Sequence, residues 1–155
     1  MSADLELLAE KVVHLDLTSF VEVVSGTSVR DTINQMRNSG NNCALIVGNG
    51  RLVGIFTDRD ALRKVVDHPD VWGGPVDDVM TRDPYIIDDQ QPAAEALKLM
   101  DEKCFRNVPV VAKTGKIIGN LTHFSLIRYL ADLYPTEVYN LPPEPGRFGD
   151  TREGG

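Results

Sequence analysis

A tandem repeat constrains this chain more strongly than any other feature of its sequence. Residues 28–66 read as helix, strand, turn, strand and helix, with a Gly-Asn-Gly turn between two short apolar runs. The same order returns near the C-terminus, where Gly119 repeats Gly54 and Thr122 repeats Thr57 at one common separation. We therefore expect two copies of one unit packed on each other, because a unit of about sixty residues buries little surface alone.

The helices of the two copies do not keep quite the same spacing. The helices that precede the two hairpins match each other at one sequence separation, and the hairpin residues match at a separation that is one residue longer. We interpret this difference as one residue gained or lost between helix and hairpin. The last helix is expected over His123–Leu133, with its apolar residues Phe124, Ile127 and Leu130 facing inward.

The charge balance excludes a broad surface for nucleic acid or anionic membranes. The 155 residues include 23 acidic and 16 basic side chains, which gives a net charge of −7. No apolar run approaches membrane-spanning length and the N-terminus lacks the layout of a signal peptide, so we expect a cytoplasmic protein. Cys43 and Cys104 show no metal-type spacing and are expected to be buried free thiols.

No pattern in the sequence indicates catalysis or a metal centre. The three histidines, His14, His68 and His123, do not cluster in the sequence. No nucleophile stands at a spacing that would pair it with a base. We therefore expect a protein that is not an enzyme, with no catalytic residue, no metal and no required cofactor.

Periodicity and composition divide the chain into five segments. Leu5, Leu8 and Val12 fall at helical spacing, whereas the Pro- and Gly-rich C-terminus cannot form a core. The expected segments are an N-terminal helix (1–17), a first repeat (18–68), a linker (69–76), a second repeat (77–134) and an extended tail (135–155).

Five short strings, repeated in order at matching spacing, carry a family resemblance. They are Cys43-Ala-Leu-Ile-Val, Gly54-Ile-Phe-Thr-Asp-Arg-Asp60, Asp78-Val-Met-Thr-Arg-Asp-Pro84, Asn107-Val-Pro-Val-Val111 and Gly119-Asn-Leu-Thr122. From about Thr18 to Leu133 the chain resembles a tandem pair of CBS domains, often called a Bateman module. The resemblance implies an α+β (α/β-like) fold of two β-α-β-β-α repeats, packed sheet to sheet about a pseudo-twofold axis.

The resemblance also implies a ligand. Members of this family are mostly regulatory and bind adenine-containing molecules, commonly AMP, ADP or ATP, in clefts between the paired domains. In their Gly-x-x-Thr-x-x-Asp pattern the threonine contacts phosphate and the aspartate contacts the ribose, which maps onto Thr57 and Asp60. The expected ligand-binding set is Val21, Gly40, Asn41, Asn42, Thr57, Asp60, Arg106 and Asn107. Thr57 and Asp60 would equally suit an ordinary helix cap, and Arg106 an exposed position beside a strand.

The second repeat departs from the family pattern, because Ser125 stands where the first repeat has Asp60. A weaker second site would consist of Thr81, Pro84, Tyr85, Ile86, Thr122 and Ser125. We therefore expect one good nucleotide site and one weak or empty site.

Three functions fit these observations. The first is a free-standing regulatory module that binds an adenine nucleotide and signals, by a conformational or oligomeric change, to a separate and unidentified protein. The second is a ligand-free scaffold for dimerisation, and the third, against which the missing catalytic pattern speaks, is an enzyme. S-adenosylmethionine or NAD is the alternative ligand of a binding module. Apolar residues on more than one helix face predict a twofold homodimer; they are Leu62, Val65, Val66, Leu126, Ile127 and Leu130.

Overall fold

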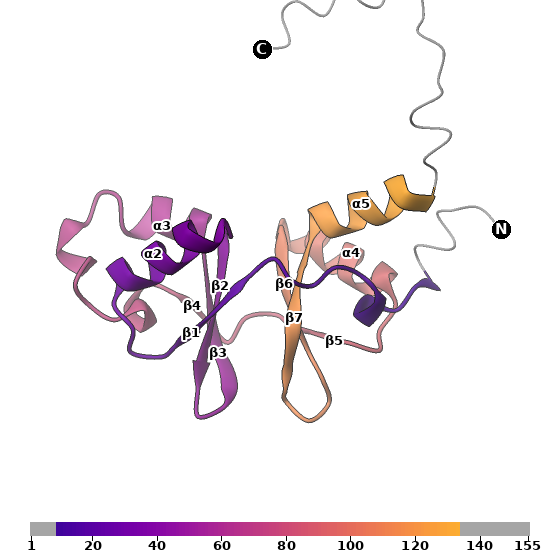
Figure 1. Ribbon diagram of the computed structural model, residues 1–155, viewed down its shortest axis with the longest axis horizontal. Coiled ribbons are helices and arrows are strands. Elements are labelled where there is room, and N and C mark those ends of the chain that lie inside the picture. The colour runs from indigo at the N-terminus through magenta and orange to yellow at the C-terminus, as the bar shows by residue number, and fades with distance from the viewer. Residues whose placement is uncertain (1–8, 134–155) are drawn as a thin grey trace, which may run out of the picture.

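Two sheets, each covered by two helices, stand side by side in the computed structural model, which describes residues 9–133 (Figure 1). The first half contains β1 (Val21–Val24), α2 (Val29–Ser39), β2 (Cys43–Gly48), β3 (Arg51–Thr57) and α3 (Asp58–Lys64). The second half contains β5 (Ile87–Asp88), α4 (Ala93–Lys103), β6 (Asn107–Val111), β7 (Ile117–Thr122) and α5 (His123–Leu133). Between and before them lie η1 (Val12–His14), η2 (Pro69–Val71), η3 (Val76–Asp78) and β4 (Thr81–Arg82).

Local sequence explains where the first long helix begins and ends. Ser28 is the N-cap of α2, and its hydroxyl oxygen accepts a hydrogen bond from the Asp31 amide at 3.0 Å. Gly40 ends α2 in the left-handed conformation, with φ at 71°. Cys104 takes the same role after α4, with φ at 56°, and its position in this C-terminal turn leaves it exposed. The expectation of a buried thiol is therefore confirmed for Cys43 but wrong for Cys104.

The difference in length between the repeats lies in the hairpin turn. Cys43 pairs with Thr57 in the first half, and Asn107 pairs with Thr122 in the second, so both hairpins start in the same register. Between the equivalent pairs Val47–Leu52 and Val111–Ile117, the chain has four residues (48–51) in the first half and five (112–116) in the second. The expected insertion between helix and hairpin is wrong, because an exposed turn accommodates an extra residue without shifting the strand register.

Segments ahead of the two repeats are exchanged between the halves. We call residues 12–20 the first leader and residues 76–86 the second leader. Thr81 of the second leader pairs with Ile55 in β3, and Thr18 of the first leader forms a bridge with Asn120 in β7. Each leader therefore adds to the sheet of the other repeat before the chain enters its own. Sequence periodicity did not reveal the two-residue strand β4.

The exchange extends to the hydrophobic cores. Figure 1 shows the indigo N-terminal segment beside α4 of the second repeat. Val12 and Val76 are 0% exposed, and each packs in the core of the repeat whose sheet its leader joins. The Val12 amide donates to the Gln91 carbonyl oxygen at 2.9 Å, and the Val76 amide donates to the Thr27 carbonyl oxygen at 2.8 Å. Val12 is equivalent to Val76 in the repeat, and Thr27 to Gln91, so the exchange follows the pseudo-twofold relation.

A third apolar cluster joins the two sheets. It contains the buried Cys43, Leu45 and Ile55, with the partly buried Phe20, Leu52 and Ile117 packed against them. Burial raises the pKa of the Cys43 thiol well above its ordinary range, so this cysteine is a neutral core residue. The expected sheet-to-sheet packing of two repeats is thereby confirmed.

Other expectations concern the ends of the chain and the last helix. The expected N-terminal helix falls partly on residues 1–8, outside the described residues; from 9 to 17, Ala9 is helical and η1 and extended chain follow, because this backbone bonds to Asp89 and Gln91. The tail also lies outside the described part. α5 spans the expected residues, but Phe124 and Ile127 are 66% and 55% exposed, and Leu126 is the buried one.

Candidate functional site

The junction of β3 and α3 holds a carboxylate in a fixed position. The Thr57 amide donates to Asp60 Oδ2 at 3.1 Å, and the Asp60 amide donates to Thr57 Oγ1 at 3.4 Å. This capping box leaves the Asp60 residue 9% exposed. The junction therefore places a negatively charged acceptor, with little freedom to move, where a strand ends.

Two further groups act on the other carboxylate oxygen. Lys64 Nζ lies 3.2 Å from Asp60 Oδ1 and also donates to the Val79 carbonyl oxygen at 3.0 Å. Thr81 Oγ1 donates to the same Oδ1 at 3.3 Å. Sequence reasoning missed Lys64, although its position one helical turn after Asp60 was a usable signal. Lys64 thus links the carboxylate to the second leader.

The second leader continues past Asp60 into an aromatic contact with the second half. The rings of Tyr85 and Phe105 lie 5.7 Å apart, and Lys103 Nζ lies 5.1 Å from the Tyr85 ring. From α3, Arg59 Nη1 donates to the Cys104 carbonyl oxygen at 3.5 Å. The Tyr85 side chain remains 53% exposed and so offers an open ring face. We call this region the Asp60 site; it comprises Thr57, Arg59, Asp60, Thr81, Tyr85, Phe105 and Arg106.

Cations surround this site although the chain as a whole is acidic. Arg59 and Arg106 are both exposed, and Lys103 lies beside the Tyr85 ring. The buried carboxylate of this region, Asp60, is already paired with Lys64. Such a set favours a ligand that combines hydroxyl donors for the carboxylate with a negatively charged group for the arginines.

The equivalent place in the second repeat is filled by the first leader. Ser125 is 5% exposed, and its Oγ donates to the Asp16 carbonyl oxygen at 2.7 Å. The Ser125 amide donates to Thr122 Oγ1 at 3.1 Å. Hydrogen bonds from the Thr18 hydroxyl and amide lower the pKa of Asp16, whose Oδ2 lies 3.6 Å from Arg128 Nη1. We call this region the Ser125 site. Among the residues with these contacts, only Asp16 of the first leader carries a carboxylate.

The structure groups the expected ligand residues differently from the sequence-based expectation. Thr81 contacts Asp60, and Pro84, Tyr85 and Ile86 follow it in the second leader, so these four belong with the first repeat's carboxylate. Asn41 Nδ2 donates to the Phe20 carbonyl oxygen at 3.3 Å, which places the turn of residues 40–42 beside the first leader. Val21 follows that leader directly and therefore lies near the same turn. The physical reason is the exchange of leaders, which spacing within one repeat does not reveal.

Asn107 serves the interior between the two sheets. Its Oδ1 accepts a hydrogen bond at 3.0 Å from Asn120 Nδ2, which also donates to the Ser19 carbonyl oxygen at 3.1 Å. Asn120 is 0% exposed, and its own Oδ1 has no partner among the described residues. Arg106 and Asn107 are the two residues expected to reach across from the second repeat. The Arg106 side chain is exposed, whereas the Asn107 side chain is already hydrogen-bonded to Asn120.

A hollow of about 650 Å³ lies elsewhere, between α2 and α3. Its lining is apolar except for Arg30, whose guanidinium carbon lies 5.9 Å from the centre of the Trp72 ring. Among residues 9–133 no three His, Cys, Asp or Glu side chains gather in a way that could hold a metal ion. No helix in that range has both the length and the apolar character needed to cross a bilayer.

Comparison with known proteins agrees with the repeat. The CBS domain family model matches residues 12–67 and again residues 76–132. An uncharacterised 17.7 kDa protein of Acidianus ambivalens is 26% identical over 138 residues, which cover 88% of this chain and 82% of that protein. Two longer relatives are each 32% identical: arabinose 5-phosphate isomerase KdsD of Pseudomonas aeruginosa and meiotically up-regulated gene 70 protein of Schizosaccharomyces pombe. The matches cover 79% and 78% of this chain but only 37% and 18% of those proteins.

Solved structures show the same architecture. CBSX2 in complex with AMP superposes with a TM-score of 0.67 at 27% identity, covering 79% of this chain and 97% of CBSX2. The CBS domain pair of protein MJ0100, in complex with 5′-methylthioadenosine and S-adenosylmethionine, gives a TM-score of 0.72 at 21% identity. That match covers 81% of this chain and 98% of the MJ0100 pair.

Proposed function

Because this chain belongs to the CBS domain family, we propose that it is a regulatory module whose Asp60 site binds an adenine nucleotide of the AMP, ADP or ATP class. The observation that carries the proposal is the Asp60 carboxylate, 9% exposed and fixed by Thr57, at a place that the second leader supplies with an open aromatic ring. CBSX2, 27% identical to this chain, has been crystallised with AMP, which supports the ligand class.

Each group at the Asp60 site has a role in this proposal. Asp60 accepts hydrogen bonds from the two ribose hydroxyls, and Thr57 meets the phosphate. The exposed face of Tyr85 stacks on the adenine. Arg59 and Arg106 neutralise the phosphate charge, because guanidinium groups pair well with phosphate oxygens. The Ser125 site, which lacks an acid on α5, binds weakly or not at all.

The same cations separate the nucleotides from the alternative ligands. S-adenosylmethionine carries a positive sulfonium centre, which Arg59, Lys103 and Arg106 would repel. NAD shares the adenosine part but needs room for a second nucleoside. A ligand-free scaffold is the remaining alternative, and it predicts no binding of any of these molecules. In the regulatory proposal the nucleotide changes the shape or assembly of a cytoplasmic homodimer, which then acts on a separate protein.

Calorimetry with AMP, ADP, ATP, NAD and S-adenosylmethionine tests the proposal. We expect about one adenine nucleotide per chain, and a loss of affinity of at least about tenfold in Asp60→Ala, since two charge-assisted hydrogen bonds disappear. Asp58→Ala is the matched control, because Asp58 is an exposed acid in the same helical turn. It should bind like the parent chain.

Two results would contradict the proposal. Absence of binding at about 1 mM, a weak affinity for a nucleotide of this size, would favour the scaffold. Equal affinity of Asp60→Ala and the parent would place the site elsewhere. Thermal unfolding of both variants separates lost binding from lost folding.

A further inference from the structure

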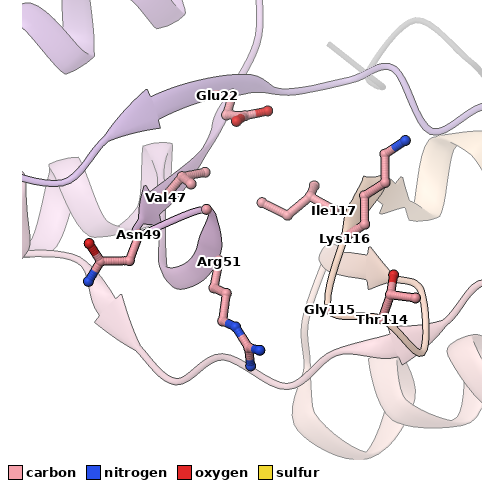
Figure 2. A pocket seen from close by; sticks show the side chains of 9 residues that line it. Glu22, Val47, Asn49, Arg51, Thr114, Gly115, Lys116 and Ile117 are labelled. Atoms are coloured by element: carbon pink, nitrogen blue, oxygen red, sulfur yellow. The ribbon is translucent and has the colours of Figure 1, made fainter.

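A second hollow, of about 390 Å³, lies between the two hairpin turns (Figure 2). β2 runs from Cys43, which pairs with Thr57, to Gly48, which pairs with Arg51. The hollow is therefore one strand length from the Asp60 site, roughly 17 Å at about 3.3 Å per residue. It is independent of the nucleotide proposal, since the two share no residue.

The pseudo-twofold relation brings two cations to this hollow. Arg51 and Lys116 both line it and occupy equivalent positions in the two repeats, so each is the first residue after an equivalent turn. The third charged residue in the lining, Glu22 of β1, breaks the symmetry, because its counterpart in the second repeat is Ile86. The hollow thus carries two positive groups and one negative group in a chain whose net charge is −7.

These three groups are available to a ligand. All three side chains are exposed, and none of them takes part in an ion pair within residues 9–133. Figure 2 shows Glu22 and Lys116 reaching toward one side of the hollow and Arg51 lying on the opposite side. The apolar side chains of Val47 and Ile117 lie between them.

We propose that this hollow binds a small zwitterion with one ammonium group and one or two anionic groups, as in an acidic amino acid or an amine phosphate. Glu22 accepts hydrogen bonds from the ammonium group, while Lys116 and Arg51 pair with the carboxylate or phosphate groups. Val47 and Ile117 contact the carbon chain that joins these ends. The volume lies at the lower end of the range for small-molecule sites, which suits a ligand of this size.

Calorimetry on the full chain with L-glutamate, phosphoethanolamine and inorganic phosphate tests this proposal. We expect the first or the second to bind, and Glu22→Gln to weaken that binding about tenfold, since a charge-assisted pair is lost. Phosphate alone should bind more weakly, and Glu22→Gln should leave its binding unchanged or stronger because repulsion is removed. Lys116→Gln should weaken both kinds of probe. Asp60→Ala should bind the zwitterion like the parent.

Two exposed residues outside the lining provide matched controls. Lys113→Gln removes a cation from the same turn as Lys116, and Glu102→Gln removes an exposed acid from α4. Both should bind like the parent. Three outcomes would overturn the proposal: no binding of either zwitterion at about 10 mM, equal effects of Lys113→Gln and Lys116→Gln, or zwitterion binding that Glu22→Gln leaves unchanged.

Discussion

At position 125 the second repeat carries a serine whose hydroxyl group is already committed to the first leader. An aspartate there would face the Asp16 carbonyl oxygen, which now accepts a hydrogen bond from Ser125 Oγ at 2.7 Å. In the first repeat Lys64 neutralises Asp60, but the counterpart of Lys64 in the second repeat is Tyr129. We therefore expect Ser125→Asp to lower the free energy of unfolding by about 1 to 3 kcal/mol, and to create no second nucleotide site. Urea unfolding and calorimetry measure the two effects.

A matched variant separates charge from size at this position. Asparagine has nearly the same volume as aspartate but no charge, so Ser125→Asn should destabilise the protein less than Ser125→Asp. Tyr129 itself donates to Glu10 Oε2 at 2.9 Å and packs on the core, so Tyr129→Lys alone should be destabilising. Ser125→Asp should therefore cost less stability in the Tyr129→Lys background than in the parent, because the lysine supplies the missing cation. If Ser125→Asp unfolds at the same urea concentration as the parent, the argument from Lys64 fails.

Two glycines show what the exchange of leaders demands of individual strands. An alanine Cβ at Gly119 would lie 2.5 Å from both the Cβ and the carbonyl oxygen of Leu17, whereas at Gly54 it would lie 2.3 Å from Met80 Sδ. Backbone cannot move aside as a flexible methionine end can. We expect Gly119→Ala to cost about 3 kcal/mol of stability and Gly54→Ala about 1 kcal/mol. Chemical denaturation of both variants measures the two losses of stability. A larger loss in Gly54→Ala than in Gly119→Ala would contradict the argument.

Elements with a local cause were predictable from the sequence. Thr57 accepts the capping hydrogen bond that its position suits, Gly40 ends its helix in the left-handed conformation, and the hairpins follow their turn residues. β4 was not predictable, because Thr81 becomes a strand residue only by pairing with the distant Ile55. The expected grouping of Thr81 with Ser125 was wrong for the same reason, because Thr81 contacts Asp60 instead. Thr57 and Asp60 were found within one motif, whereas their neighbours come from a segment of the other repeat.

At the scale of the whole molecule, the exchange predicts that each leader stabilises the repeat it enters. Val12 and Val76 are both 0% exposed at equivalent positions. Val12→Ala should lose about 2 kcal/mol and speed hydrogen exchange in α4 and β6, while Val76→Ala should do so in α2 and β2. Each variant is the control for the other. Faster exchange confined to the first repeat in Val12→Ala would contradict the exchange of leaders.

The exposed faces of α3 and α5 carry the prediction of a homodimer. Leu62 and Ile127, at equivalent positions in the two repeats, are 69% and 55% exposed, and Val66 and Phe124 beside them are 63% and 66% exposed. We expect light scattering at about 10 μM to give a dimer for the parent, as a standard-size interface predicts, and a monomer for Leu62→Glu. Arg37→Glu, an exposed change on α2, is the control. A monomeric parent would contradict the prediction.

The crossing of the leaders also bears on how such a chain arises from a single unit. In a single repeat the leader would have no core to pack in, and the core would remain partly exposed. Two separate copies would bury both surfaces by exchanging their leaders. When two copies are joined in one chain, this exchange becomes an intramolecular domain swap. Each repeat then meets the other at an effective concentration on the order of millimolar. Gene duplication would thereby replace a pairing that depends on dilution with one that does not, and the two copies become free to diverge, as Asp60 and Ser125 have.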